Sequence, residues 1–333
     1  MSTSRLSFLF LLLLGLSLWS CNQDPKPTET IVEVKPKEKL QIPKFQKDSA
    51  YAYVEGQLAF GPRKPNTDAH TACKNWLVSQ FKKFGATVEE QNFEAKAYTG
   101  EMLKGTNIIA KYNPAQTDRI VLAAHWDTRH MADEETEASE RKKPIMGADD
   151  GGSGVAVLME IARLIQANGI GDQGIDIVLF DLEDYGDDES GNTNSWCLGS
   201  QYWSRNLNYS ERKPKFGILL DMVGAKNARF AREAVSMQFA GNYTNKVWKL
   251  AMAMGYGNYF TSETGKGITD DHYFVNTIAQ IPMLDIINVQ ATGRFGAHWH
   301  THDDQIDIID KQSLRAVGQV VVAVIYKSAS GTF

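Results

Sequence analysis

Short runs of apolar residues, almost unbroken by polar positions, restrict the fold of this chain more than any other feature. Residues 120–124 read Ile-Val-Leu-Ala-Ala, and residues 175–180 read Ile-Asp-Ile-Val-Leu-Phe. Such runs suit strands that are buried on both faces of a largely parallel sheet, whereas a strand with one solvated face alternates. Five segments are predicted to be strands of this kind: residues 105–112, 119–125, 174–180, 216–220 and 281–287.

Segments with the period of a helix lie between the predicted strands. Thr67 or Asp68 can cap a helix that runs to residue 84 and stops at Gly85. Apolar residues also recur at helical spacing within residues 154–168, 244–254 and 311–327. This alternation predicts an α/β fold, a three-layer sandwich in which helices flank a mixed, mostly parallel central sheet. Residues 45–333 are expected to form it as one domain.

The composition excludes several classes of protein. Hydrophobic residues make up 43% of the chain and charged residues 23%, which is typical of a globular protein and not of a disordered one. The chain has 35 Lys and Arg against 40 Asp and Glu, a net charge of -5, so we expect no nucleic-acid partner. Three cysteines cannot make a disulfide framework in 333 residues, and a Cys73–Cys197 pair stays open. We expect a monomer.

The first 44 residues are predicted to lie outside the catalytic domain. Arg5 and the uncharged apolar run 8–18 are typical of a signal peptide, here residues 1–21, and the run is too short to span a bilayer. Cys21 ends a segment that resembles the cleavage box of bacterial lipoproteins, and residues 22–44 form a Pro-, Lys- and Glu-rich flexible linker. We therefore expect an exported, periplasmic lipoprotein that contacts the membrane only through a lipid on Cys21. The alternative is a plain secretory signal.

Acidic and histidine side chains stand where the predicted strands end or a helix begins. They are His125 and Asp127, Asp150, Glu183 and Asp184, Asp221, and His300. Ligands of open α/β sheets bind beyond the carboxyl ends of the strands, so we expect these side chains to gather there. Carboxylate and imidazole ligands without a thiolate suit a catalytic zinc with an open position. Taken singly, each of these acidic residues can also be explained as a helix cap or as part of a solvated turn. Two further histidines, His70 and His130, are interpreted as surface residues.

Five motifs in this order resemble the zinc-dependent aminopeptidase superfamily, whose fold is a phosphorylase/hydrolase-like sandwich, from about residue 45 onward. They are His125-Trp126-Asp127, residues 147–154, Glu183-Asp184, Asp221 and His300. Within the superfamily, the chain more closely resembles animal-type glutaminyl-peptide cyclotransferases, in a bacterial lipoprotein form. Trp299 directly before His300, the Asp-Asp-His of residues 270–272 and the Cys-Leu-Gly-Ser of residues 197–200 carry this closer resemblance.

The resemblance implies a reaction and a role for each residue. An enzyme of this family converts the N-terminal Gln of peptides and proteins to pyroglutamate and releases ammonia, with one zinc per chain. The implied zinc ligands are Asp150, Asp184 and His300, and the implied general acid/base is Glu183. Asp221 and Asp270 are implied as carboxyls that hydrogen-bond around the reacting nitrogen. Trp299 and Trp196 are implied as walls of the substrate pocket. His125 and Asp127 are implied as a second metal site or as structural groups.

Two positions depart from the animal pattern. Asp184 replaces a longer Glu ligand, so the backbone has to approach the metal more closely. Asp285 stands where the animal enzymes have a histidine near the site. The loop 185–196 also differs in length and acidity, which leaves the shape of the pocket open.

Two other functions remain open at the level of the sequence. A two-zinc aminopeptidase would use His125, Asp150 and Asp221 for one zinc and Asp150, Asp184 and His300 for the other. In that enzyme Glu183 would activate a water. A non-enzymatic binding relative would keep the fold but is expected to have lost a ligand or the acid/base, and all of these residues are in place.

Overall fold

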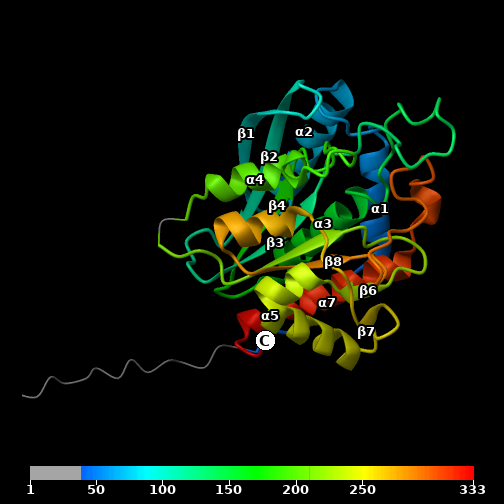
Figure 1. Ribbon diagram of the computed structural model, residues 1–333. Helices are drawn as coiled ribbons and strands as arrows, with labels where there is room; N and C mark the ends of the chain where they lie inside the picture. Colours follow the sequence, from blue (N-terminus) through cyan, green and yellow to red (C-terminus); the bar gives the residue numbers. More distant parts are fainter. Residues whose placement is uncertain (1–38, 210) are drawn as a thin grey trace, which may run out of the picture. The chain divides into compact units, whose positions relative to one another are not determined.

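Six strands form one mixed sheet at the centre of the fold (Figure 1). The structure is a computed structural model that describes residues 39–209 and 211–333. The strands are β1 (Thr87–Lys96), β2 (Met102–Tyr112), β3 (Arg119–His125), β4 (Gly174–Phe180), β5 (Gly217–Asp221) and β8 (Met283–Ile287). Their order is β1-β2-β4-β3-β5-β8. The pairs β4–β3, β3–β5 and β5–β8 are parallel. The pairs β1–β2 and β2–β4 are antiparallel.

Helices cover both faces of the sheet (Figure 1). On one face lie α1 (Lys47–Leu58), α2 (Asp68–Lys83), α3 (Gly152–Asn168), α5 (Ala234–Ala253) and α7 (Lys311–Ala329). On the other lie α4 (Leu198–Arg205) and the π-helical turn Val275–Ala279 that follows α6 (Asp271–Phe274). The remaining elements are β6 (Phe230–Arg232), which pairs parallel with β7 (Phe260–Thr264), and the short turns Thr193–Ser195 and Ile306–Ile308.

The central strands are buried on both sides because their residues alternate between two cores. Along β3, Ile120 and Leu122 join the cluster beneath α3 and α7, whereas Val121 and Ala123 join the cluster beneath α4. Every residue of β3 and of β4 is buried. The predicted three-layer sandwich with a mostly parallel sheet is confirmed.

Most of the predicted elements occur, with shifted ends. β3 and β4 have the predicted bounds, and Thr67 caps α2 by accepting a hydrogen bond from the His70 N–H. Helix α5 begins ten residues before its predicted start, since its first turns bury little apolar surface. The sequence analysis missed α1, β1, β6 and β7. Edge strand β1 was missed because Phe93 is its one buried residue, so its apolar pattern is weak.

The predicted signal peptide 1–21, the lipid on Cys21 and most of the linker 22–44 lie outside the described residues. These assignments and the periplasmic location stay predictions. From residue 40 the chain already contacts the domain, because Leu40 N–H donates to Ser330 Oγ (3.0 Å) and Gln319 Nε2 donates to the Pro43 carbonyl (3.0 Å). Among the described residues, no helix combines the length and apolar character that a membrane span requires.

Gly154 lets helix α3 lie against strand β5, which places the residues before α3 beside the end of that strand. A Cβ at Gly154 would lie 2.2 Å from the Leu220 carbonyl oxygen, a backbone atom that cannot rotate away. At Gly241 of α5, a Cβ would meet only the flexible end of Met237, at 3.8 Å.

We predict that Gly154→Ala lowers the free energy of unfolding by about 2–3 kcal/mol, because the added methyl overpacks a rigid contact. The control change Gly241→Ala, next to the kink of α5 at Ala240, should be neutral or stabilise by up to about 1 kcal/mol, since the added methyl meets no rigid atom and Ala has less conformational freedom in the unfolded chain. Urea unfolding followed by circular dichroism measures both. Equal effects of the two substitutions would contradict the proposed close approach.

Candidate active site

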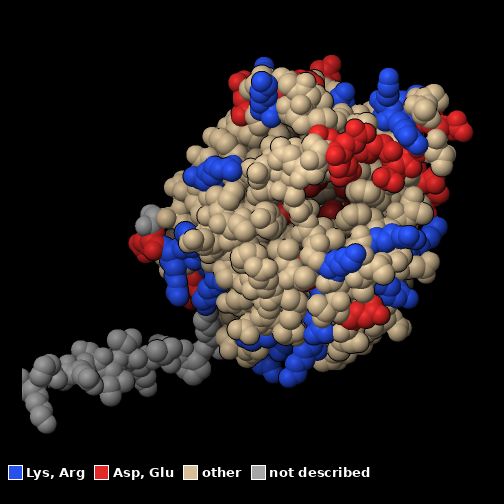
Figure 2. Space-filling view, in the orientation of Figure 1, with Lys and Arg blue, Asp and Glu red and all other residues tan. Residues whose placement is uncertain are grey.

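The parallel strands end at a cavity of about 290 Å³ that opens to the surface. Its lining includes the predicted residues Asp150, Glu183, Asp184, Trp196, Asp221, Asp270, Trp299 and His300. Asp187 and Asp188 of the loop after Glu183 also line it. Figure 2 shows acidic side chains gathered along one edge of a hollow in this face of the molecule. The predicted convergence of these side chains, from distant parts of the chain, is observed.

Asp150, Asp184 and His300 form a buried group with the spacing of metal ligands. One ligand atom from each lies within 4.8 Å of the others. His300 Nε2 is 3.2 Å from Asp184 Oδ1 and 3.8 Å from Asp150 Oδ2. A tetrahedral zinc with bonds of about 2.0–2.2 Å separates its ligand atoms by roughly 3.3–3.6 Å. Neither oxygen of Asp184 accepts a hydrogen bond from the described residues, so this buried carboxylate fits a cation.

Asp150 is held through its backbone. The Asp304 carboxylate accepts the N–H of Asp149 (2.7 Å) and of Asp150 (3.1 Å). The buried Arg63 guanidinium donates to the carbonyls of Met146 and Gly147, which precede the same loop. The loop therefore enters α3 in one fixed conformation, and the Asp150 side chain remains available.

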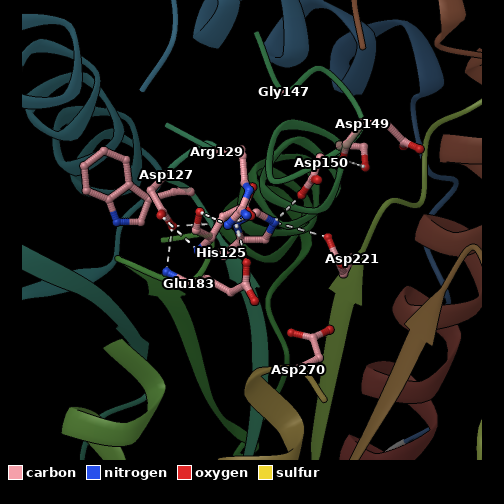
Figure 3. A network of polar contacts seen from close by, with 12 residues as sticks. His125, Asp127, Arg129, Gly147, Asp149, Asp150, Glu183, Asp221 and Asp270 are labelled. Carbon is pink, nitrogen blue, oxygen red and sulfur yellow. Dashed lines mark hydrogen bonds and ion pairs between the residues drawn. The ribbon is translucent and has the colours of Figure 1, made fainter. Parts of the chain in front are cut away.

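Glu183 and Asp184 are held by a third carboxylate. Asp127 Oδ1 accepts the N–H of Glu183 (3.1 Å) and Asp127 Oδ2 accepts the N–H of Asp184 (3.3 Å), as Figure 3 shows for Glu183. The preceding Leu182 has a φ of 57°, a conformation that is strained for a leucine. Asp127 thus has a structural role here, fixing the turn after β4.

His300 is oriented by an aspartate on its far side. Its Nδ1 lies 3.2 Å from Asp133 Oδ1, and Asp133 is also paired with Arg129. The Arg129 guanidinium further donates to the carbonyls of Asp184 (3.2 Å) and Gly186 (2.9 Å). Nδ1 makes no hydrogen bond with good geometry among the described residues, so Asp133 acts on His300 through its negative charge, and Nε2 is the ring atom that faces Asp184 and Asp150.

His125 belongs to a second buried group that shares Asp150. His125 Nε2 lies 3.0 Å from Asp150 Oδ1 and 3.2 Å from Asp221 Oδ1 (Figure 3). The pair of His125 Nε2 with Asp221 has hydrogen-bond geometry, whereas His125 Nδ1, like both oxygens of Asp184, has no hydrogen-bond partner among the described residues. Both ligand sets predicted from the sequence are therefore assembled.

Glu183 stands among buried carboxyl groups that favour a proton. Only 13% of its side chain is exposed. Burial is the main cause that raises the pKa of Glu183 well above its usual range, and the carboxylates of Asp184 and Asp270 add to it. Burial also raises the pKa of Asp221 to about 7. Figure 3 shows Glu183, Asp221 and Asp270 turned toward a common space. A carboxyl that binds a proton near neutral pH suits general acid/base catalysis.

Burial disfavours charge on the group of Asp150, Asp184 and His300, while the charges of neighbouring side chains act against one another. Burial raises the pKa of Asp184 to about 6, and the Asp150 carboxylate contributes. Burial opposes charge on His300 too, yet Asp184 and Asp133 raise its pKa to about 9. Crowded carboxylates in a dry site therefore require positive charge, and a divalent cation supplies it without protons.

Two indole rings stand beside this group. Trp299 stacks on the His300 ring at 3.7 Å between centroids, and Trp196 lies parallel to the same ring at 6.2 Å. The Arg129 guanidinium carbon lies 4.5 Å above the Trp196 ring. Both tryptophans line the cavity, as predicted, and neither is fully buried.

His70 is not the surface residue that the sequence analysis expected. It is 5% exposed, its Nε2 lies 2.8 Å from Asp181 Oδ1, and its ring stacks on Trp126 at 4.2 Å. The prediction was wrong because an acid 111 residues away satisfies the ring inside the core. His130 is half-buried and stacks on Tyr185 at 3.8 Å.

Several residues of the site were not predicted. Asp133 and Arg129 act on His300 and on backbone from positions with no motif. Asp304 belongs to the segment around Trp299 and His300, and Arg63 stands in a Gly-Pro-Arg segment, but their bonds to backbone were not predicted. Asp285 is fully buried, and neither of its oxygens accepts a hydrogen bond from the described residues. The open question on cysteines is resolved, since Cys73 and Cys197 are both buried free thiols.

Known proteins resemble this chain over most of its described length. Residues 107–325 match the model of peptidase family M28. A Bacteroides thetaiotaomicron glutaminyl cyclase, crystallised with N-acetylhistamine, is 48% identical with a TM-score of 0.83 and covers 86% of this chain and 99% of its own. A Zn-dependent exopeptidase from Parabacteroides distasonis is 46% identical with a TM-score of 0.83 and the same coverage. A glutaminyl-peptide cyclotransferase of Drosophila melanogaster is 25% identical over 277 residues, 75% of this chain and 72% of that protein.

These similarities agree with the motifs and with the site. The family match spans β3, β4, β5 and the helices between them, and therefore includes all of the predicted ligands. The resemblance to the zinc aminopeptidase superfamily and to the glutaminyl-peptide cyclotransferases is confirmed, whereas the lipoprotein form stays a prediction. The chain belongs to peptidase family M28 and, within that family, to the glutaminyl cyclases.

Proposed function

We propose that this protein is a zinc-dependent glutaminyl-peptide cyclotransferase that converts the N-terminal glutamine of peptides and proteins to pyroglutamate and releases ammonia. The observation that carries this proposal is the position of Glu183. Its carboxyl lies beside the group of Asp150, Asp184 and His300, at the base of a small cavity. The similarity to the glutaminyl cyclases supports the same reaction.

Asp150, Asp184 and His300 would hold one zinc ion. Their atoms are spaced for it, they are buried, and Asp133 fixes the histidine. The chemistry that the zinc supplies when bound is polarisation of the side-chain amide carbonyl of glutamine. The protein's own contribution is to hold the ligands rigid, since Asp127, Asp304 and Arg63 fix the backbone on either side.

Glu183 moves the proton. The α-amine nitrogen forms a bond to the side-chain amide carbon, and the Glu183 carboxylate accepts the proton that this nitrogen gives up. Glu183 then returns the proton to the amide nitrogen as the old carbon–nitrogen bond breaks and ammonia leaves. One group can perform both steps because burial raises the pKa of Glu183 well above its usual range.

Asp270 and Asp221 orient the reacting nitrogens. Asp270 Oδ2 is buried and accepts no hydrogen bond from the described residues, although its other oxygen caps α6. Both carboxyls line the cavity and face Glu183, so they can accept hydrogen bonds from amine or amide N–H groups (Figure 3). Held this way, the amine is close to the amide carbon before the reaction.

The two indoles shape the pocket and keep water out. Trp299 and Trp196 flank the His300 ring on the cavity side. The substrate supplies its own nucleophile, so a cavity of about 290 Å³ is large enough for a glutamine side chain. Water in the same place would hydrolyse the amide to glutamate, and apolar walls disfavour it.

A two-zinc aminopeptidase is the second candidate, and a specific observation favours it. His125, Asp150 and Asp221 also lie within ligand distance of one another, and one relative of similar identity is an exopeptidase. We prefer one zinc because His125 already donates to Asp221, whereas both Asp184 oxygens lack a hydrogen-bond partner among the described residues.

Incubation of the full chain with a Gln-initiated peptide tests the proposal. We expect the peptide to lose the mass of one ammonia molecule while every residue is retained, and we expect a chelator to abolish the loss and added zinc to restore it. An Asn-initiated peptide is the matched control, because its shorter side chain cannot close a five-membered ring. Release of the free N-terminal amino acid would instead identify an aminopeptidase.

Glu183→Gln should lower kcat for the Gln-initiated peptide by about 10²–10⁴-fold, because the amide cannot accept the proton from the α-amine. The zinc content should be unchanged, since Glu183 is not in the ligand group. Steady-state kinetics with metal analysis of the same sample measures both. Wild-type turnover in this variant would remove Glu183 from the mechanism.

Asp133→Asn should weaken zinc binding about 10–100-fold, because the orienting negative charge behind His300 is lost. The matched control is Asp172→Asn on an exposed turn, which should bind zinc like the wild type. Competition with a chromophoric chelator gives both affinities. An unchanged affinity in Asp133→Asn would contradict the orienting role of Asp133.

A further inference from the structure

Cys197 is a buried thiol in contact with Glu183, and the reaction described above gives it no role. Its exposed fraction is 0%. Its Sγ lies 3.1 Å from Glu183 Oε1 in hydrogen-bond geometry, with the thiol as donor. The motif that begins at this residue entered the sequence analysis as part of the family resemblance, with no role for the thiol.

Cys197 also holds Glu183 through the backbone. The Cys197 N–H donates to the Glu183 carbonyl (2.9 Å), and the next residue, Leu198, donates to the Leu182 carbonyl (3.0 Å). Cys197 and Leu182 each have a φ of 57°, the left-handed region that non-glycine residues rarely adopt. Two strained residues therefore face each other across a pair of hydrogen bonds, which is typical of backbone that is fixed for a function.

We propose that Cys197 is a positioning residue for Glu183: its thiol donates a hydrogen bond to Oε1, holds the carboxyl in one rotamer and leaves Oε2 to exchange the proton with the substrate. This inference rests on the proposed cyclotransferase function. Glu183 Oε2 is the oxygen on the side of the ligand groups, where it lies 3.8 Å from His125 Nδ1. With Oε1 engaged by the thiol, Oε2 is the more available base.

The surroundings keep this thiol a donor. Burial is the main cause that raises the pKa of Cys197 well above its usual range, and the Glu183 carboxylate contributes. A thiol in that state is a poor nucleophile and keeps its proton for donation. The contact with an acceptor at 3.1 Å remains as its chemical function.

Variants of the full chain test the inference. Cys197→Ala should lower kcat about tenfold, the low end expected for a lost hydrogen bond to a charged group. The KM for the Gln-initiated peptide and the zinc content should change less than about twofold, because neither binding nor ligands are touched. Cys197→Ser keeps a donor and should recover most of kcat. Cys73→Ala removes the other buried thiol, in α2, and should behave like the wild type.

A spectroscopic readout separates positioning from packing. The S–H stretching band of Cys197 is isolated as the infrared difference between the wild type and Cys197→Ser. In a Glu183→Gln background, the band should move to higher frequency, because a neutral amide is a weaker acceptor than a carboxylate. An unmoved band would overturn the proposal, whatever the variants do to activity.

The kinetic outcomes also distinguish the two claims. If the wild type does not cyclise glutamine, the proposed function fails. If the wild type cyclises glutamine and Cys197→Ala matches its kcat, only the role of Cys197 fails. A loss of zinc in Cys197→Ser, or no recovery of kcat by the serine, would contradict positioning and would indicate a metal-binding or purely structural role.

Discussion

Buried carboxylates crowded around one point are the constraint on which this structure depends. Like charges in a dry site oppose one another, so Asp150, Asp184 and Glu183 cannot all stay ionised without positive charge between or beside them. Burial raises the pKa of Asp184 to about 6, and the neighbouring Asp150 carboxylate adds to it. A cation at the ligand group resolves the conflict for Asp150 and Asp184. Glu183 is left beside it with a raised proton affinity, which is the property that its role requires.

The fold brings these groups together by two separate means. Parallel strands β3, β4 and β5 end at one edge of the sheet, and the close contact at Gly154 brings α3 and its preceding loop to the same edge. The backbone of the loops is then fixed by ionic groups that do not face the substrate. Asp127, Asp304 and Arg63 each bond to main-chain atoms next to a ligand. The strained conformation at Leu182 persists because the bonds from Asp127 to the two residues that follow it hold the turn.

The sequence was sufficient for the buried strands β2, β3, β4, β5 and β8, for the edge where the site lies and for its ligand types, because these follow from local patterns. Strand β3 and the groups at its end needed only an apolar run and the rule for open sheets. Local sequence patterns do not predict which side chains pair over long sequence distances. For that reason the pairs of Asp133 with His300 and of Asp181 with His70 were missed. Strand β1 lacked an apolar pattern. The contact of Cys197 with Glu183 needs two left-handed residues, and no periodicity predicts those.

The central claim is that one divalent cation lies among Asp150, Asp184 and His300. Anomalous diffraction at the zinc absorption edge, from crystals of the purified protein, tests it most directly. We expect one peak, bonded to these three side chains at about 2.0–2.2 Å. A second peak of similar height between His125 and Asp221 would replace the one-zinc account with that of a two-zinc peptidase. No peak at the first group would contradict the account altogether.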